Sequence, residues 1–461
     1  MVQLKLEKYE YAFDNSSKYL MSIQKPIVFY KIHKEDKRKL FLTFVILDIS
    51  KGKITYLFSY TKENIDIIQH LQNEEKYYLM LVPHSTIEIN EKKDFFVFLQ
   101  EEQFFLYVNY RDNILRIYTM EDIIDEDISF KKISSTFYKD DIDNNFFYMA
   151  ASDYDNNLHI YRVSLDLKMI DKIDSFPGKN TPPHVVRKNN NCLLLSHEFN
   201  EANYLLKKLN KTINSQEMGT LLVKNSMRIN MANPGISSEE MKGILYNNLK
   251  QKYDISCLPG KVIIYDLFTK ERIDYQTSGG SPAHFEIDKT ENMVYVSSHN
   301  FFNRLDSMSF FGPAVFDKFL FRNNRLTWCS SFSYEKGYRY ASHRVFYNNG
   351  VPYICTFGQA NRLIFVDARS MQLFYYDDIG TDELSDKTDV EMYLNTRESG
   401  GEFAALEVSQ DGKNILFLDN QYIYIYNFEE RKLCHKIEYR AEEKEDWDQY
   451  ILRTLHITFL Q

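Results

Sequence analysis

The feature that most constrains the fold of this chain is an internal repeat with a period of roughly 40 to 50 residues. Each repeat has two short apolar strands around a polar turn, followed by two further strands, and it is clearest at 281–299 and 400–439. Short runs of Val, Ile, Phe and Tyr are separated by Asp, Asn, Gly or Lys, which indicates strands and turns. Such repeats are typical of β-propellers, in which every unit forms one blade.

Counting the units predicts an all-β chain that forms a seven-bladed β-propeller as a single domain over 1–461. The content of 34 Phe and 34 Tyr agrees with this class, because aromatic side chains pack well on a pleated sheet. The segment 451–461 is left over, and we expect it to pair with the first unit and remove exposed sheet edges. The units span about 9–60, 80–125, 133–176, 180–278, 281–334, 339–380 and 400–440.

Two units carry insertions between their second and third strands. In blade 4 the segment 200–258 is inserted, and its SSEEMKGILYNNLKQKY portion has a Ser cap, a following Glu and helical apolar spacing, which predicts a partly helical lid. In blade 5 the shorter segment 300–312 lies at the same point of the repeat. Long insertions at equivalent points of neighbouring blades predict a cover over one place.

Histidines recur at two fixed positions of the repeat. His184 and His284 open the first strand of units four and five, and His197 and His299 close the second strand. Unit six has His343 at the first position and Gln359 near the second. Because the first two strands of a blade are antiparallel, the start of one and the end of the other lie at the same sheet edge. The spacings of 13, 15 and 16 residues suit such hairpins, so we expect five histidines at one end of the channel.

Clustered neutral imidazoles without thiolates are ligands for Fe(II), Cu or Zn, so His184, His197, His284, His299 and His343 are the candidate metal ligands. A single histidine at such a position is more often a packing residue, but its repetition favours the metal site. Candidate residues for orienting a metal ligand or contacting a substrate are Glu198, Glu286, Gln359, Tyr340, Arg344 and His84. The favoured interpretation of Arg344 is nevertheless surface pairing, and that of His84 is a loop role. We interpret the remaining histidines as structural: His33, His70, His159, His435 and His456.

Other features exclude whole classes of function. The net charge is −9 and charges of both signs are mixed along the chain, so nucleic acid is not an expected partner. No stretch approaches the length of an apolar membrane span, and five dispersed cysteines without a CxxC motif fit reduced thiols, so we expect a cytoplasmic protein. No GxSxG, HExxH, Walker or GxGxxG motif occurs.

The stretch GGSPAHFEIDKTENMVYVSSH at 279–299 resembles blades of the YVTN, lactonase-like and selenium-binding (methanethiol oxidase) propellers. The resemblance covers the repeat pattern over 180–440. Carotenoid cleavage oxygenases are similar in that they hold iron with four histidines on the axis of a seven-bladed propeller. The present chain departs from them, because its histidines form pairs on two adjacent blades and a single on the third, so no substrate is carried over.

These observations predict a metal-dependent enzyme with a histidine-bound Fe or Cu ion, or Zn, that acts as an oxidase or oxygenase on a small organic substrate. A metal-assisted lyase or lactonase is the alternative within enzymes, since a bound ion also polarises carbonyls. A non-catalytic propeller that binds protein is the alternative outside them. The restriction of the histidines to three neighbouring blades disfavours a propeller that only binds protein.

Overall fold

The computed structural model of this chain describes the repeated strands and some of the turns between them. Up to residue 106, and at further positions in later strands, the backbone alone is described. The described residues are 2–5, 7–12, 27–36, 39–48, 53–60, 83–90, 94–99, 104–109, 114–119, 130–133, 138–140, 143, 145–153, 157–177, 185–189, 192–197, 231, 261–279, 281–288, 290–299, 301–303, 308–310, 315–333, 343–357, 362–379, 404–409, 411–418, 422–438 and 458–459.

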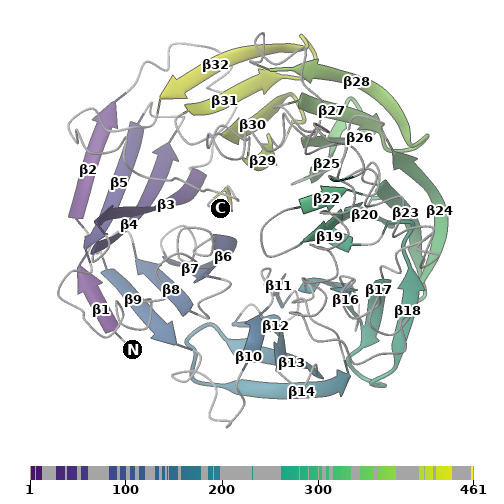
Figure 1. The fold of residues 1–461 in the computed structure, drawn as a ribbon, viewed down its shortest axis with the longest axis horizontal. Coiled ribbons are helices and arrows are strands. Elements are labelled where there is room, and N and C mark those ends of the chain that lie inside the picture. The colour runs from purple at the N-terminus through teal and green to yellow at the C-terminus, as the bar shows by residue number, and fades with distance from the viewer. Residues whose placement is uncertain are drawn as a thin grey trace.

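In these residues the strands form seven sheets of four or five strands and one two-stranded ribbon, and Figure 1 shows the sheets following one another around a common centre. We number the sheets in chain order. Sheet 1 contains β2 (Glu7–Ala12), β3 (Ile27–Asp36), β4 (Lys39–Asp48), β5 (Lys53–Tyr60) and β33 (Thr458–Phe459). Sheet 2 contains β1 (Val2–Lys5), β6 (Pro83–Asn90), β7 (Asp94–Leu99), β8 (Phe104–Asn109) and β9 (Ile114–Thr119). Sheet 3 contains β10 (Phe130–Ile133), β11 (Tyr138–Lys139), β12 (Phe146–Asp153), β13 (Asn157–Ser164) and β14 (Ile170–Pro177).

Each of the remaining sheets has four strands, which are hydrogen-bonded in chain order. Sheet 4 contains β15 (Val185–Asn189), β16 (Cys192–His197), β17 (Lys261–Asp266) and β18 (Arg272–Gln276). Sheet 5 contains β19 (Ser281–Asp288), β20 (Met293–His299), β23 (Val315–Arg322) and β24 (Arg325–Ser333), and the ribbon consists of β21 (Phe301–Asn303) and β22 (Met308–Phe310). Sheet 6 contains β25 (His343–Asn348), β26 (Val351–Phe357), β27 (Arg362–Asp367) and β28 (Gln372–Asp378). Sheet 7 contains β29 (Ala404–Val408), β30 (Asn414–Leu418), β31 (Tyr422–Asn427) and β32 (Lys432–Glu438).

Sheet 1 contains strands from both end regions of the chain, with β2 at one edge and β33 at the other. Strand β33 pairs antiparallel with β3, with Ile27 opposite Phe459 and Val28 opposite Thr458. The sequence predicted this pairing between the terminal segment and the first unit, and it is confirmed. At the other end of the chain, β1 pairs with β9 of sheet 2, whereas β2 pairs with β5 of sheet 1. The N-terminal segment therefore links the first two sheets.

One turn recurs between the third and fourth strands of sheets 4, 6 and 7. The last residue of the third strand accepts backbone N–H groups with its side chain: Asp266 from Phe268 and Thr269, Asp367 from Arg369 and Ser370, and Asn427 from Glu430. The residue four positions on has a left-handed backbone: Lys270 with φ 62°, Met371 with φ 54° and Arg431 with φ 51°. The side-chain oxygen fixes the turn locally, as Asx turns do. This repeated geometry reflects the repeat in the sequence.

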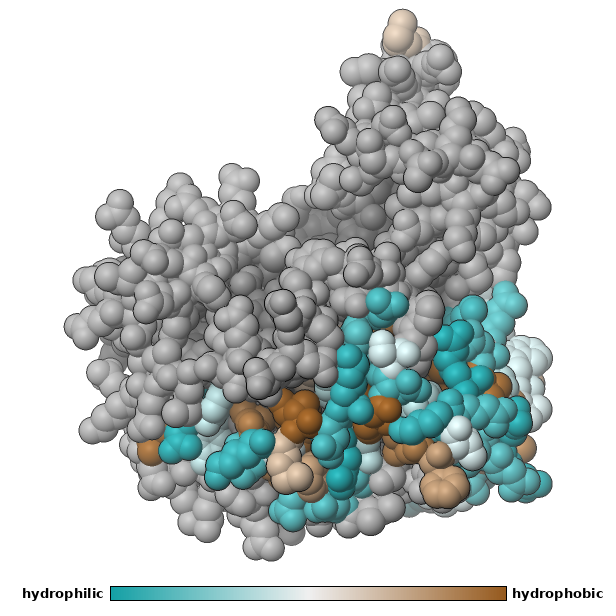
Figure 2. All heavy atoms as spheres, turned by 90° about the horizontal axis from the view of Figure 1, so that it is seen from below, coloured by the Kyte–Doolittle hydropathy of each residue, from teal (hydrophilic) through white to brown (hydrophobic). Residues whose placement is uncertain are grey.

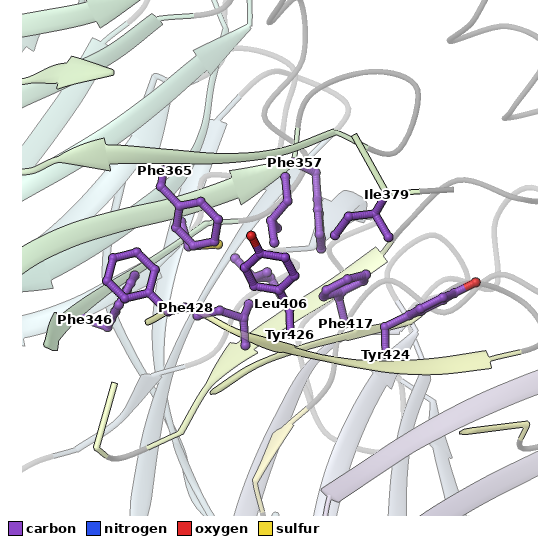
Figure 3. Close-up of a cluster of buried hydrophobic side chains, with 12 residues drawn as sticks. Phe346, Phe357, Phe365, Ile379, Leu406, Phe417, Tyr424, Tyr426 and Phe428 are labelled. Carbon is purple, nitrogen blue, oxygen red and sulfur yellow. The ribbon is translucent and has the colours of Figure 1, made fainter. Parts of the chain in front are cut away.

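Adjacent sheets pack through aromatic side chains. Between sheets 6 and 7, Phe365 stacks on Tyr426 with ring centroids 5.8 Å apart, and Phe357 meets Phe417 edge-on at 5.6 Å (Figure 3). The Tyr426 hydroxyl donates a 2.8 Å hydrogen bond to Asp377 on the outer strand of sheet 6. Buried rings thus bring large apolar area into the interface, while a hydroxyl at the end of the ring reaches a polar partner.

The predicted lid over 200–258 lies outside the described residues apart from the exposed Met231. All secondary-structure elements whose first and last residues the structure describes are strands. None of the described residues belongs to a helix that is long and apolar enough to span a membrane. In the view of Figure 2, hydrophobic residues of the described part lie scattered between hydrophilic ones.

Candidate functional site

The first strands of sheets 5, 6 and 7 lie nearest the centre of the ring and next to one another (Figure 1). They are β19, β25 and β29, and β16 of sheet 4 also lies against β19. This arrangement follows from the chain order of sheets 4 to 7, in which the strands run outward from the first to the fourth. It places the sequence-predicted residues of three different units on neighbouring strands.

In sheet 5 the register places two of the candidate histidines on the same face. His284 lies directly opposite Ser297, and His299 is two residues further along the strand of Ser297. Residues directly opposite each other, and residues two apart on one strand, share a sheet face. A bulge between Pro282 and His284 shifts the register of β19 at this point, a feature frequent beside functional sites. His284 and His299 therefore share a face near one end of sheet 5.

In sheet 4 the described part of the site is smaller. His197 is the last residue of β16 and lies opposite Lys261, the first residue of β17. His184 directly precedes β15 and lies outside the described residues. The side chains of His197, His284 and His299 also lie outside the described part, so their placement here rests on the backbone.

His343 is the first residue of β25 and is the candidate whose side chain is described. It is 2% exposed, and its ring meets Phe316 of β23 edge-on with centroids 5.0 Å apart. Burial lowers the pKa of His343 to about 3, the neighbouring Arg344 charge acts in the same direction, and a hydrogen bond with the Tyr295 backbone opposes the shift. The imidazole is therefore neutral at physiological pH, the form that binds metal ions.

Phe316 connects His343 to the histidines of sheet 5. Phe316 lies directly opposite Ser297, which in turn lies directly opposite His284. His284, Ser297 and Phe316 thus form one row across the face of sheet 5, and the ring of His343 packs against the last member of that row. The structure brings His343 to the sheet face that carries His284 and His299.

Arg344, the residue after His343 on β25, forms ion pairs with carboxylates on two other inner strands, β19 and β29. Its Nε lies 3.3 Å from both carboxylate oxygens of Glu407 on β29, and its Nη1 lies 3.9 Å from Glu286 on β19 and donates to the His343 carbonyl at 2.9 Å. Burial alone would lower the pKa of Arg344, but the two carboxylates outweigh it and raise the pKa, so the guanidinium stays charged. The sequence suggests Glu286 as a residue that orients a metal ligand and Arg344 as one that contacts substrate or pairs on the surface, and the structure places both in one ionic cluster.

For the other sequence-predicted residues the structure describes only part of the surroundings, or none. Glu198, Tyr340 and Gln359 lie outside the described residues. His84 is the second residue of β6, where the backbone alone is described. His159, interpreted as structural, is 4% exposed within β13. His435 lies in β32, where burial lowers its pKa.

Sequence reasoning missed Glu407 and Ser297. Glu407 is a charged residue in the short apolar strand AALEV, and Ser297 interrupts the apolar strand MVYVSSH. In each case a polar residue inside an apolar strand was the available signal. The contacts of Glu407 and Ser297 depend on how neighbouring sheets pack. The sequence of a single repeat unit does not encode that packing.

The residues present are chemically suited to a transition metal, although the described side chains do not form a complete ligand set. Within the described residues no three His, Cys, Asp or Glu side chains come together as a metal site. His343 is buried and neutral, and a neutral imidazole has a lone pair on one ring nitrogen that can bind a metal ion. The Ser297 hydroxyl is also buried on the face shared with His284 and His299.

Comparison with known proteins supports the fold of the chain. No family model matches the sequence, and no curated protein matches it. Structures of two mutants of the Synechocystis apocarotenoid oxygenase are similar to it, each with a TM-score of 0.54 and 8% sequence identity over 99% of this chain and 96% of that one. A structure of the dihydro-heme d1 dehydrogenase NirN has a TM-score of 0.46 and 7% identity over 95% of this chain and 75% of that one. The likeness to the apocarotenoid oxygenase shows that this chain has a β-propeller-type fold.

Proposed function

We propose that this chain is a seven-bladed β-propeller enzyme that holds a transition metal ion, Fe(II) or Cu, with histidines at one end of its channel and oxygenates a small organic substrate. The observation that carries the proposal is the row of His284, Ser297 and Phe316 on sheet 5, against which the neutral ring of His343 packs. The seven sheets found in the described residues would be the seven blades.

The roles of the individual residues follow from their positions. His284, His299 and His343 would bind the ion, and His184 and His197 would complete or surround the set from sheet 4. When bound, the ion would supply the activation of dioxygen. Burial of His343 keeps its imidazole unprotonated and ready to bind metal over the physiological pH range. The Arg344 cluster would hold β19, β25 and β29 in place beneath the histidines.

The long insertions support a covered site at the same end. Because His197 pairs with Lys261, the segment 198–260 leaves and re-enters sheet 4 at the edge where His197 lies. Likewise Ser298 pairs with Val315, so the segment that follows His299 leaves sheet 5 at the edge of that histidine. We place the partly helical lid, 200–258, over this edge. An enclosed site would exclude water from a reactive oxygen species.

Oxygen chemistry is preferred over the lyase or lactonase alternative for two reasons. Imidazole ligands leave positions open for a small second ligand. The chain also has the fold of a protein that is named as an apocarotenoid oxygenase, although 8% identity carries no substrate with it. Consumption of dioxygen with a candidate substrate, measured on the metal-loaded protein, distinguishes oxygenation from lyase or lactonase turnover.

The metal itself is tested by elemental analysis of protein purified without a histidine tag. We expect about one ion for each chain, and His284→Ala and His343→Gln each to weaken metal binding by about tenfold or more, because the remaining ligands do not replace a lost bond. His159→Gln and His435→Gln serve as matched controls and should keep the full content. Equal metal content in all four variants would contradict the proposed site.

A further inference from the structure

Ser297 is a buried serine opposite His284, and among the described residues its hydroxyl has no hydrogen-bond partner. Its exposed fraction is 0%, and its Oγ has no hydrogen-bond partner among the residues that the structure describes. Polar groups buried in this way are rare, because leaving a hydroxyl unpaired costs about 1–3 kcal/mol. A group outside the protein chain, such as a small bound ligand, would remove this cost.

The position of Ser297 indicates where such a bound molecule would lie. On β20 it lies directly between His284 of β19 and Phe316 of β23, and His299 follows two residues later on the same face. His343 from the next sheet packs against Phe316. The strand positions of His284 and His299 therefore adjoin Ser297 on one sheet face, and His343 reaches that face at Phe316.

Ser298 provides an internal comparison on the same strand. It is also 0% exposed, and its Oγ also has no hydrogen-bond partner in the described part of the chain. It lies opposite Pro282 and Val315, and as the next residue along the strand it belongs to the other face of the sheet. The two serines thus share burial and chemistry and differ in sheet face: Ser297 belongs to the face of the His284 and His299 positions, and Ser298 to the opposite face.

We infer that Ser297 hydrogen-bonds the small exogenous ligand of the histidine site, and that it selects a compact ligand with a hydrogen-bond acceptor beside the metal-binding atom. This inference rests on the proposed metal site and adds a residue that determines which ligand is held there. A serine hydroxyl donates to such an acceptor. Phe316 provides an apolar wall next to it, so the favoured ligand is small and carries its charge or lone pairs toward Ser297.

The inference is tested with azide as the probe on protein loaded with Co(II), whose visible absorption bands change when a small ligand joins the metal. Azide and Co(II) are each titrated against the wild type, Ser297→Ala and Ser298→Ala. A hydrogen bond to a charged acceptor is worth a factor of about ten or more in affinity. We expect Ser297→Ala to weaken azide binding about tenfold while its Co(II) affinity changes less than about threefold. Ser298→Ala should bind both as the wild type does.

The possible results separate the role of Ser297 from the existence of the metal site. Removing an unpaired buried hydroxyl leaves no polar group stranded, so both variants should fold, and their thermal unfolding midpoints check this. If azide affinity is unchanged in Ser297→Ala, or falls equally in both variants, the role of Ser297 is wrong while the metal site stands. If the wild type binds no Co(II), the proposed function fails and the role of Ser297 fails with it.

Discussion

Arg344 and Glu407 join the first strands of sheets 6 and 7 by a side-on ion pair, in which Nε lies 3.3 Å from both carboxylate oxygens and Nη2 lies 3.3 Å from one of them. The two side chains are 28% and 18% exposed, so the pair is largely withdrawn from water. Its guanidinium also contacts Glu286 on sheet 5. One arginine therefore connects three sheets beside the proposed site.

Replacing Glu407 should destabilise the fold more than replacing a surface partner. In Glu407→Gln the partly buried Arg344 loses its main counter-charge, and we expect the free energy of unfolding to fall by about 1–3 kcal/mol. The matched control is Glu271→Gln, whose partner Arg325 is 58% exposed. That change should cost less than about 1 kcal/mol. Urea unfolding of both variants measures the difference, and equal costs would show that the cluster adds no more than a surface pair.

The buried His343 should make stability depend on pH. Its pKa is about 3 in the fold, against an ordinary value of 6.5, so between these values the unfolded chain binds the extra proton. The stability it contributes is complete above pH 6.5 and is lost as the pH falls toward 3. Between pH 6 and 4, the unfolding free energy of the wild type should fall more steeply than that of His343→Gln, by up to about 1.4 kcal/mol per pH unit. Parallel slopes would mean that His343 is not held neutral.

Two glycines of similar backbone conformation should respond differently to alanine. Gly412 has φ 70°, and a Cβ atom there would overlap the carbonyl oxygen of Tyr347. Gly350 has φ 76°, but a Cβ atom would meet nothing within 4 Å. Gly350→Ala should cost about 1 kcal/mol from backbone strain alone, and Gly412→Ala about 2–4 kcal/mol because sheets 6 and 7 must also move apart. Thermal unfolding compares them, and equal shifts in the midpoint would contradict this close approach.

The sequence was a good guide to strands and a weaker one to contacts between sheets. Alternating apolar runs predicted hairpins such as 281–299, and the register of β19 with β20 places His284 and His299 near one end of sheet 5, as the repeat predicted. Their common sheet face became visible only in the register. Glu407 was missed because its partner, Arg344, lies on another sheet. The strand pattern encodes pairing within a blade, whereas the approach of Arg344 to Glu407 depends on how whole sheets pack.

The central claim is that imidazoles from neighbouring sheets bind one metal ion. X-ray absorption spectroscopy of the metal-loaded wild type tests it most directly, because imidazole rings give a characteristic outer-shell scattering signal. The account predicts a nitrogen shell at about 2.0–2.1 Å with scattering from at least three imidazoles. It also predicts that His343→Gln removes one of them while His159→Gln removes none. A bound metal without imidazole scattering, or the same spectrum for the wild type and His343→Gln, would contradict the account.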